Sequence, residues 1–128
     1  MAYSRRFWTA LALVPLLAGT AAAQVKTRMI TLKSGDEEIQ AFLAEPAGKG
    51  PHPGLIVIQE WWGLNDWIKE NARRFAEKGF VALAPDLYRG KVTDRMEVAA
   101  KLRTGLPNDR ALRDLKAGAF DGAAVLIP

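Results

Sequence analysis

Residues 54–63 read GLIVIQEWWG, and this stretch decides the fold. Residues 55–58 form a continuous apolar run rich in β-branched side chains, which is typical of a strand buried on both faces. Both faces are buried when helices cover a sheet, so the run indicates α/β architecture. Glu60 follows this strand at its carboxyl end, where ligands collect in such sheets. It is therefore a candidate functional residue, and the alternative is a solvated carboxylate beside two aromatic side chains, Trp61 and Trp62, that cap the core.

The residues after this stretch complete a strand–helix–strand unit. Asn65 is a plausible N-cap, and an apolar stripe follows at Ile68, Ala72, Phe75 and Ala76. Lys78-Gly79 ends the helix in the usual way, with a basic last turn and then a glycine. Residues 80–84, FVALA, then read as a second buried strand. The sequence thus predicts a βαβ unit with a right-handed crossover.

The flanking segments predict a hairpin before this unit and helices after it. Residues 25–33 alternate in polarity, residues 34–36 (SGD) signal a turn, and residues 38–44 read as a second strand. Beyond the βαβ unit, one helix is expected to start at Thr93 or Asp94 and a second at Asn108 or Asp109. Leu112, Leu115 and Ala119 are expected on the apolar side of the second helix.

Composition excludes several classes of site. The chain has 128 residues, enough for one domain, and a net charge of +4 spread among interleaved acids, so no nucleic-acid-binding stripe emerges. The absence of cysteine rules out disulfides, zinc–thiolate sites and a thiol nucleophile within these residues. The single histidine, His52, lies between two prolines and is expected to be a loop residue. No metal-ligand spacing and no glycine-rich phosphate loop are present, so we expect neither a metal nor a cofactor.

Residues 1–23 have the three parts of a secretory signal peptide. Arg5 and Arg6 supply the positive start, residues 7–17 are almost wholly apolar, and residues 21–23 (AAA) fit the cleavage rule. We expect cleavage after Ala23, which places residues 24–128 in the periplasm or outside the cell with no stable membrane anchor. An uncleaved anchor is the alternative, although the apolar core is short for a membrane span.

Two motifs at this spacing resemble the dienelactone hydrolase family of α/β-hydrolases. They are VIQEWWGLN at residues 57–65 and ARRFAEKGFVALAPDLYRG at residues 72–90, and the likeness extends over residues 31–115. The resemblance implies a partial α/β-hydrolase fold: an N-terminal β-hairpin, then a βαβ unit, then C-terminal helices. Residues 24–128 would form this domain. It also implies hydrolysis of ester or lactone bonds of small molecules, and the interleaved charges described above predict no nucleic-acid partner.

The resemblance assigns roles to two residues, and two further aromatic residues are candidates beside them. Glu60 matches the carboxylate that contacts the nucleophile in this family, and the backbone N–H of Trp61 matches a donor of the oxyanion hole. Trp62 and Tyr88 are candidates for substrate binding, and core packing is the alternative for both.

The nucleophile elbow of the family has no counterpart in this sequence. There is no G-x-C-x-G or G-x-S-x-G motif, and no downstream Asp and His follow. We therefore expect these 128 residues to be catalytically inert, as a truncated hydrolase, with the central strand open at one edge unless residues 123–127 pair with it. Two alternatives stay open: a non-enzymatic extracytoplasmic α/β binding module, and a fragment of a serine-type α/β-hydrolase.

Overall fold

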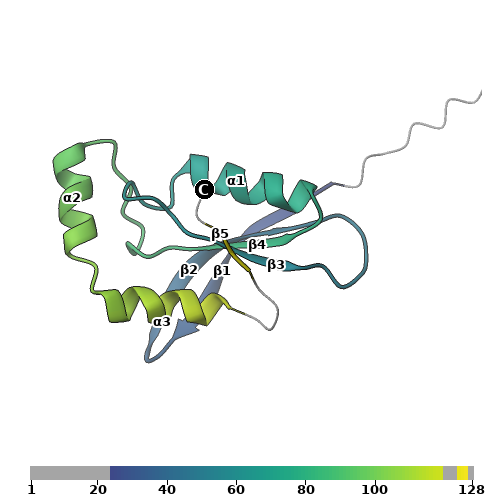
Figure 1. The fold of residues 1–128 in the computed structure, drawn as a ribbon, viewed down its shortest axis with the longest axis horizontal. Helices are drawn as coiled ribbons and strands as arrows, with labels where there is room; N and C mark the ends of the chain where they lie inside the picture. The colour runs from purple at the N-terminus through teal and green to yellow at the C-terminus, as the bar shows by residue number, and fades with distance from the viewer. Residues whose placement is uncertain (1–23, 120–123, 127–128) are drawn as a thin grey trace, which may run out of the picture.

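The computed structural model describes residues 24–119 and 124–126, which form a mixed five-stranded sheet with helices on both faces (Figure 1). The strands are β1 (Lys26–Ser34), β2 (Glu37–Glu45), β3 (Gly54–Val57), β4 (Val81–Pro85) and β5 (Ala124–Leu126). The helices are α1 (Asp66–Glu77), α2 (Met96–Thr104) and α3 (Asn108–Gly118). The hairpin, the βαβ unit and the C-terminal helices are all present, so the predicted α/β fold class is confirmed. The predicted signal peptide lies outside the described residues.

The sheet places β3 between two parallel neighbours. Its order is β1–β2–β4–β3–β5, in which β1, β2 and β4 pair antiparallel, while β3 is parallel to both β4 and β5. Leu55, Ile56 and Val57 face Ala124, Val125 and Leu126 in register. Residues 124–126 therefore pair with the edge of the central strand that faces away from β4.

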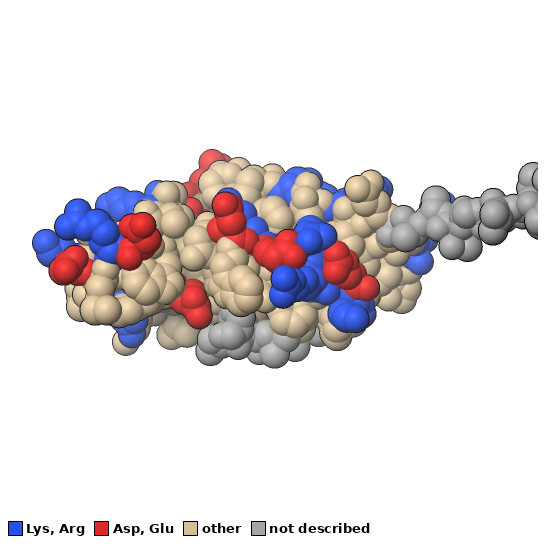
Figure 2. All heavy atoms as spheres, turned by 90° about the horizontal axis from the view of Figure 1, so that it is seen from above, with Lys and Arg blue, Asp and Glu red and all other residues tan. Residues whose placement is uncertain are grey.

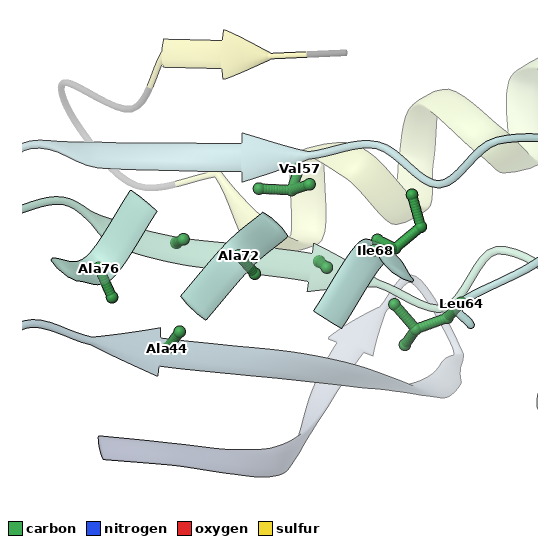
Figure 3. Close-up of a cluster of buried hydrophobic side chains, with 8 residues drawn as sticks. Ala44, Val57, Leu64, Ile68, Ala72 and Ala76 are labelled. Carbon is green, nitrogen blue, oxygen red and sulfur yellow. The ribbon is translucent and has the colours of Figure 1, made fainter. Parts of the chain in front are cut away.

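Helix α1 covers one face of the sheet, as its apolar stripe predicts. The Asn65 side chain accepts a hydrogen bond from the backbone N–H of Ile68 at 3.1 Å, so the predicted N-cap is confirmed. Ile68, Ala72 and Ala76 point from α1 onto Ala44 and Val57 of the strands (Figure 3). Because alanine side chains are small on both the helix and the strands, α1 lies close to the sheet. This close packing positions the loop that leads from β3 into α1.

The outer face of α1 carries charges of both signs. Arg73 forms ion pairs with Glu70 and Glu77 at 2.7 Å, and Arg74 pairs with Glu70 at 3.1 Å. Acidic and basic side chains are interleaved over this side of the molecule (Figure 2). Exposed pairs of this kind contribute little to stability. Within the described residues, no helix combines the length and apolarity that crossing a bilayer requires.

Helix α3 packs on the opposite face, but only partly through the stripe that we predicted. Leu112 is 57% exposed and Ala119 is also exposed, whereas Leu115 packs against the cluster formed by Leu43, Ile56 and Leu83 and their neighbours. The fully buried residues on this helix are Asp114 and Gly118. A methyl group on Gly118 would come within 2.7 Å of Leu83 Cδ2, so the glycine permits close contact with the sheet. The predicted stripe was therefore right at Leu115 and wrong at Leu112 and Ala119, because Asp114 and Gly118 also occupy the buried side of the helix.

Asp114 belongs to a hydrogen-bonded cluster, buried at Ser34 and Asp114 and exposed at Glu37, which joins three separate segments. Asp114 accepts hydrogen bonds from Ser34 Oγ at 2.6 Å and from Arg89 NH1 at 2.7 Å. Arg89 also donates to Glu37 at 2.7 Å. The Asp114 cluster, comprising Ser34, Glu37, Arg89 and Asp114, thus joins the end of the β1–β2 hairpin and the loop after β4 to α3.

Candidate active site

A cavity of about 420 Å³ opens at the carboxyl end of β3, where the sequence predicts a site. The residues after β3 form one side, the loop after β4 a second, and the junction of α2 and α3 a third. Its apolar walls are Ile58, Leu87, Leu106, Ala111 and Leu115. Its volume lies within the range of roughly 300–1,000 Å³ typical of small-molecule sites.

Glu60 and Trp61 both line this cavity. Glu60 is exposed, and its carboxylate makes no hydrogen bond or ion pair to another described residue. Trp61 is 38% exposed, and among residues 24–119 and 124–126 no acceptor binds its backbone N–H. With respect to the described residues, an unpaired carboxylate and an unbonded amide donor therefore lie next to each other at this cavity.

Trp62 does not line this cavity. Its ring packs edge-on against that of Trp61, with ring centroids 4.9 Å apart, and its carbonyl accepts a hydrogen bond from Thr93 N at 3.1 Å. The structure thus brings Glu60, Trp61 and Tyr88 to one cavity and places Trp62 behind Trp61, against the loop that precedes α2.

Residues 60–63 form a tight turn that presents the two tryptophans. Gly63 N donates to Glu60 O at 3.3 Å, which closes the turn around Trp61 and Trp62. Gly63 has a φ of +94°, a left-handed conformation that glycine adopts without strain. A methyl group there would lie 2.2 Å from the carbonyl oxygen of Lys91. Glycine is therefore required at position 63 both by the backbone angle and by the neighbouring loop.

Alanine at position 63 should measurably destabilise the protein. We expect Gly63→Ala to lower the free energy of unfolding by about 3 kcal/mol, combining left-handed strain with overlap against Lys91 O. Gly79 is a matched control, because its φ is also +94° but nothing lies within 4 Å of an added methyl group. Gly79→Ala should cost only about 1 kcal/mol. Urea unfolding measures the loss of unfolding free energy in each variant. Equal losses for the two variants would contradict the predicted overlap with Lys91.

Side-chain hydrogen bonds from Gln59 and Asp86 hold the loop of Leu87 and Tyr88 in place. Asp86 Oδ1 accepts from Tyr88 N at 3.1 Å, and Asp86 Oδ2 accepts from Gly90 N at 2.5 Å. Gln59 Oε1 accepts from Leu87 N at 3.1 Å. The two motifs that carry the family resemblance are therefore joined directly by a hydrogen bond, between Gln59 of the first and Leu87 of the second.

Tyr88 is 6% exposed and forms part of the cavity wall. Burial raises the pKa of its hydroxyl, and the nearby Arg103 partly opposes that rise. The phenol therefore stays neutral at physiological pH, where it can donate as well as accept a hydrogen bond.

Three polar residues of the cavity were missed by the sequence reasoning about sites: Gln59, Arg103 and Asn108. Gln59 is buried, and its Nε2 has no hydrogen-bond partner among the described residues. Arg103, from the last turn of α2, supplies a cation. Gln59 immediately precedes Glu60 in the motif, a signal that could have identified it. Nothing local marks Arg103, because only the packing of α2 beside α3 brings it here.

A larger cavity of about 670 Å³ lies at the other end of the sheet. Its lining includes His52 and Gly79, which precede the amino ends of the parallel strands β3 and β4. Chemistry in such sheets collects at the carboxyl ends, so we place the candidate active site in the smaller cavity. His52 is thus at the opposite end from Glu60. The described residues contain no cluster of three or more His, Asp or Glu side chains suited to a metal ion.

Sequence comparison identifies relatives over most of the described region. Residues 39–121 match the sequence model of the dienelactone hydrolase family. A putative carboxymethylenebutenolidase of Synechocystis sp. is 34% identical over 101 residues, which is 73% of this chain and 41% of that protein. Protein usf of Aquifex pyrophilus is 42% identical over 86 residues, which is 65% of this chain and 36% of that protein. The chain thus spans about two fifths of the length of these relatives.

Structural comparison agrees with the sequence comparison. A putative dienelactone hydrolase from Klebsiella pneumoniae superposes with a TM-score of 0.70 at 26% identity, covering 80% of this chain and 49% of that one. The dienelactone hydrolase-like promiscuous phosphotriesterase P91, from metagenomic libraries, superposes with a TM-score of 0.66 at 28% identity, covering 81% and 49%. The described sheet and helices therefore correspond to about half of a complete fold of this type.

Proposed function

The chain belongs to the dienelactone hydrolase family, and from that premise we propose that it forms part of a hydrolase for small carboxylic esters or lactones. The observation that carries the proposal is the Glu60–Trp61 turn, which borders an apolar cavity with an unbonded amide donor. The cavity volume of about 420 Å³ suits a small substrate.

In this proposal each of the four candidate residues has a chemical task. The Trp61 N–H stabilises the negative oxygen that develops when a nucleophile attacks the ester carbonyl. Glu60 acts on the ionisation of that nucleophile, because a nearby carboxylate either accepts its proton or repels its anion. Tyr88 contributes a neutral hydroxyl to the cavity wall, and Trp62 supports the ring of Trp61 from behind.

The nucleophile and its histidine partner are not supplied by the described residues. There is no cysteine, and Ser34 is buried and bonded to Asp114. His52 lies at the amino end of the sheet. We therefore propose that these 128 residues alone turn over no ester, and that catalysis requires residues such as those in the remaining length of the relatives.

A chimera tests this proposal. Residues 24–126 replace the matching portion of the Synechocystis relative, and hydrolysis of p-nitrophenyl acetate and of a dienelactone is measured. We expect no turnover by the 128-residue chain and clear turnover by the chimera, because the chimera unites this cavity with a nucleophile. A folded but inactive chimera would favour the non-enzymatic binding module. Turnover by the 128-residue chain itself would show that the nucleophile has been misassigned.

We further propose that the protein is exported and acts outside the cytoplasm, which rests on the charge and apolarity of residues 5–17 and the alanines at 21–23. Expression of the full chain in a Gram-negative host should yield a periplasmic product beginning at Gln24. N-terminal sequencing of the fractionated protein checks this. An intact Met1 terminus in the soluble cytoplasmic fraction would contradict it.

A further inference from the structure

A third cavity, smaller than the two described above, shares Tyr88 with the candidate active site and is lined mainly by basic residues. It has a volume of about 220 Å³, and its lining includes Arg89, Lys91, Lys101 and Arg110. No carboxylate of the described residues lines it. We call it the cationic cavity. Lys and Arg side chains gather at the α2 end of the molecule, next to a few acidic groups (Figure 2).

Three of these four cations have no ion-pair partner in the part of the chain that the structure describes. Arg89 is neutralised by Asp114 and Glu37. Among the described residues, neither Lys91, Lys101 nor Arg110 forms an ion pair with a carboxylate. Grouping like charges around one hollow costs stability unless an anion is present to offset their repulsion.

The guanidinium of Arg110 also has few hydrogen-bond partners among the described residues. Its only hydrogen bond to a described residue is a long one of 3.5 Å, from NH2 to the carbonyl of Leu87. Its Nε is buried and has no acceptor within the described part of the chain. A guanidinium is a planar fork of donors matched to the oxygens of carboxylate and phosphate groups. Within the described residues, the Nη donors of Arg110 that do not contact Leu87 are therefore available to an oxyanion.

We propose that the cationic cavity binds a phosphate-class oxyanion. Three unpaired positive charges favour a ligand that carries more than one negative charge. The volume of about 220 Å³ is below the range of roughly 300–1,000 Å³ for drug-sized ligands. The occupant is thus an inorganic phosphate ion or the phosphate group of a small ester, held by Lys91, Lys101 and Arg110.

The bound anion would touch the wall of the candidate active site. Tyr88 lines both cavities, and Arg110 contacts the carbonyl of Leu87, whose side chain lines the active-site cavity. This connection gives the anion a route to influence the neighbouring cavity. The proposal itself depends only on the cationic cavity and stands whether or not ester hydrolysis is confirmed.

Thermal unfolding of the full chain in increasing phosphate tests the proposal, with sodium chloride at matched ionic strength as reference. A ligand that binds only the folded state raises Tm as its concentration passes Kd, and we expect a saturable rise of roughly 4–8 °C. Lys101→Gln and Arg110→Gln should each reduce the response at least about fivefold. Lys49→Gln is the matched control, since Lys49 is an exposed lysine that does not line the cationic cavity.

Two further measurements identify the ligand and exclude variants that do not fold. Circular dichroism without phosphate establishes that each variant is folded, and Lys91→Gln replaces any variant that is not. Phenyl phosphate is titrated beside inorganic phosphate: a response to inorganic phosphate indicates the free ion, and a response to phenyl phosphate alone indicates the end group of an ester. A response equal to that of chloride, or one that Lys49→Gln reduces as much as Lys101→Gln does, overturns the proposal.

Discussion

Replacing Asp114 with alanine is expected to lower the free energy of unfolding by about 2–4 kcal/mol, because Ser34 and Arg89 lose a buried acceptor and Arg89 keeps only its exposed partner Glu37. Asp114 has no exposed surface, and it is bonded to Ser34 and Arg89. Without it, Arg89 loses its buried acceptor while its backbone stays in a left-handed conformation, at a φ of 55°. Many small domains have a total stability of about 5–15 kcal/mol, so a loss of this size could be most of it.

Urea or thermal unfolding at pH 7 measures this loss, with Asp109→Ala as the matched control. Asp109 is an exposed aspartate in the first turn of the same helix, and its removal should cost less than about 1 kcal/mol. Similar losses for the two variants would show that the Asp114 cluster contributes little to stability.

The Asp114 variant should also change how stability depends on pH. Burial alone would raise the pKa of Asp114, but the hydrogen bonds from Arg89 and Ser34 outweigh burial and leave that pKa below its usual value. A carboxyl with a lowered pKa in the folded state contributes stability above its unfolded pKa of about 3.9, and this contribution is lost as pH falls further. The difference between the wild type and Asp114→Ala should therefore narrow below about pH 4. A constant difference from pH 7 to pH 3 would contradict the assigned charge.

Replacing Trp61 with proline in the active chimera should lower kcat by about 100- to 1,000-fold, the usual effect of losing one oxyanion-hole donor. Proline removes the backbone N–H, which a side-chain substitution cannot do. The position tolerates it, because Trp61 occupies the second place of a four-residue turn, where proline is favoured, and its N–H bonds to no described residue.

Trp61→Ala is the matched control, since it removes the indole ring and keeps the N–H. We expect it to change KM more than kcat, because the ring lines the cavity, whereas in the proposal the backbone N–H donates a hydrogen bond to the oxyanion. Steady-state kinetics on both chimeras separates the two effects. If proline and alanine lower kcat equally, the backbone N–H of Trp61 is not the oxyanion donor.

Local sequence signals predicted the parts of the fold that local interactions determine. The apolar runs of β3 and β4 and the Asn65 cap each depend on residues within one helical turn or one strand, and the structure contains all of them. The βαβ unit followed from these elements, because short connections permit few topologies. The carboxyl end of β3 could be named as the site for the same reason, since the fold class fixes where ligands collect.

The parts that could not be predicted depend on partners far apart in the chain. Asp114 is buried on α3 because it meets Arg89 and Ser34, which are 25 and 80 residues away. Helical periodicity considers only neighbouring residues of the helix, so it placed Leu112 on the buried side, whereas Leu112 is exposed. Arg103 enters the cavity through the packing of α2, a helix with a weak apolar face and a single buried residue, Ala99.

The hydrogen bond from Leu87 N to Gln59 limits how this site can be redesigned. Any replacement at position 59 must offer an oxygen at the same reach, or the buried Leu87 amide is left without an acceptor. Asparagine has one methylene fewer and does not reach the Leu87 amide, and glutamate would place a charge at a buried position. Mutant libraries of the chimera that test the proposed site should therefore keep Gln59 fixed and vary the apolar walls at Leu106, Ala111 and Leu115, whose side chains form no such hydrogen bond.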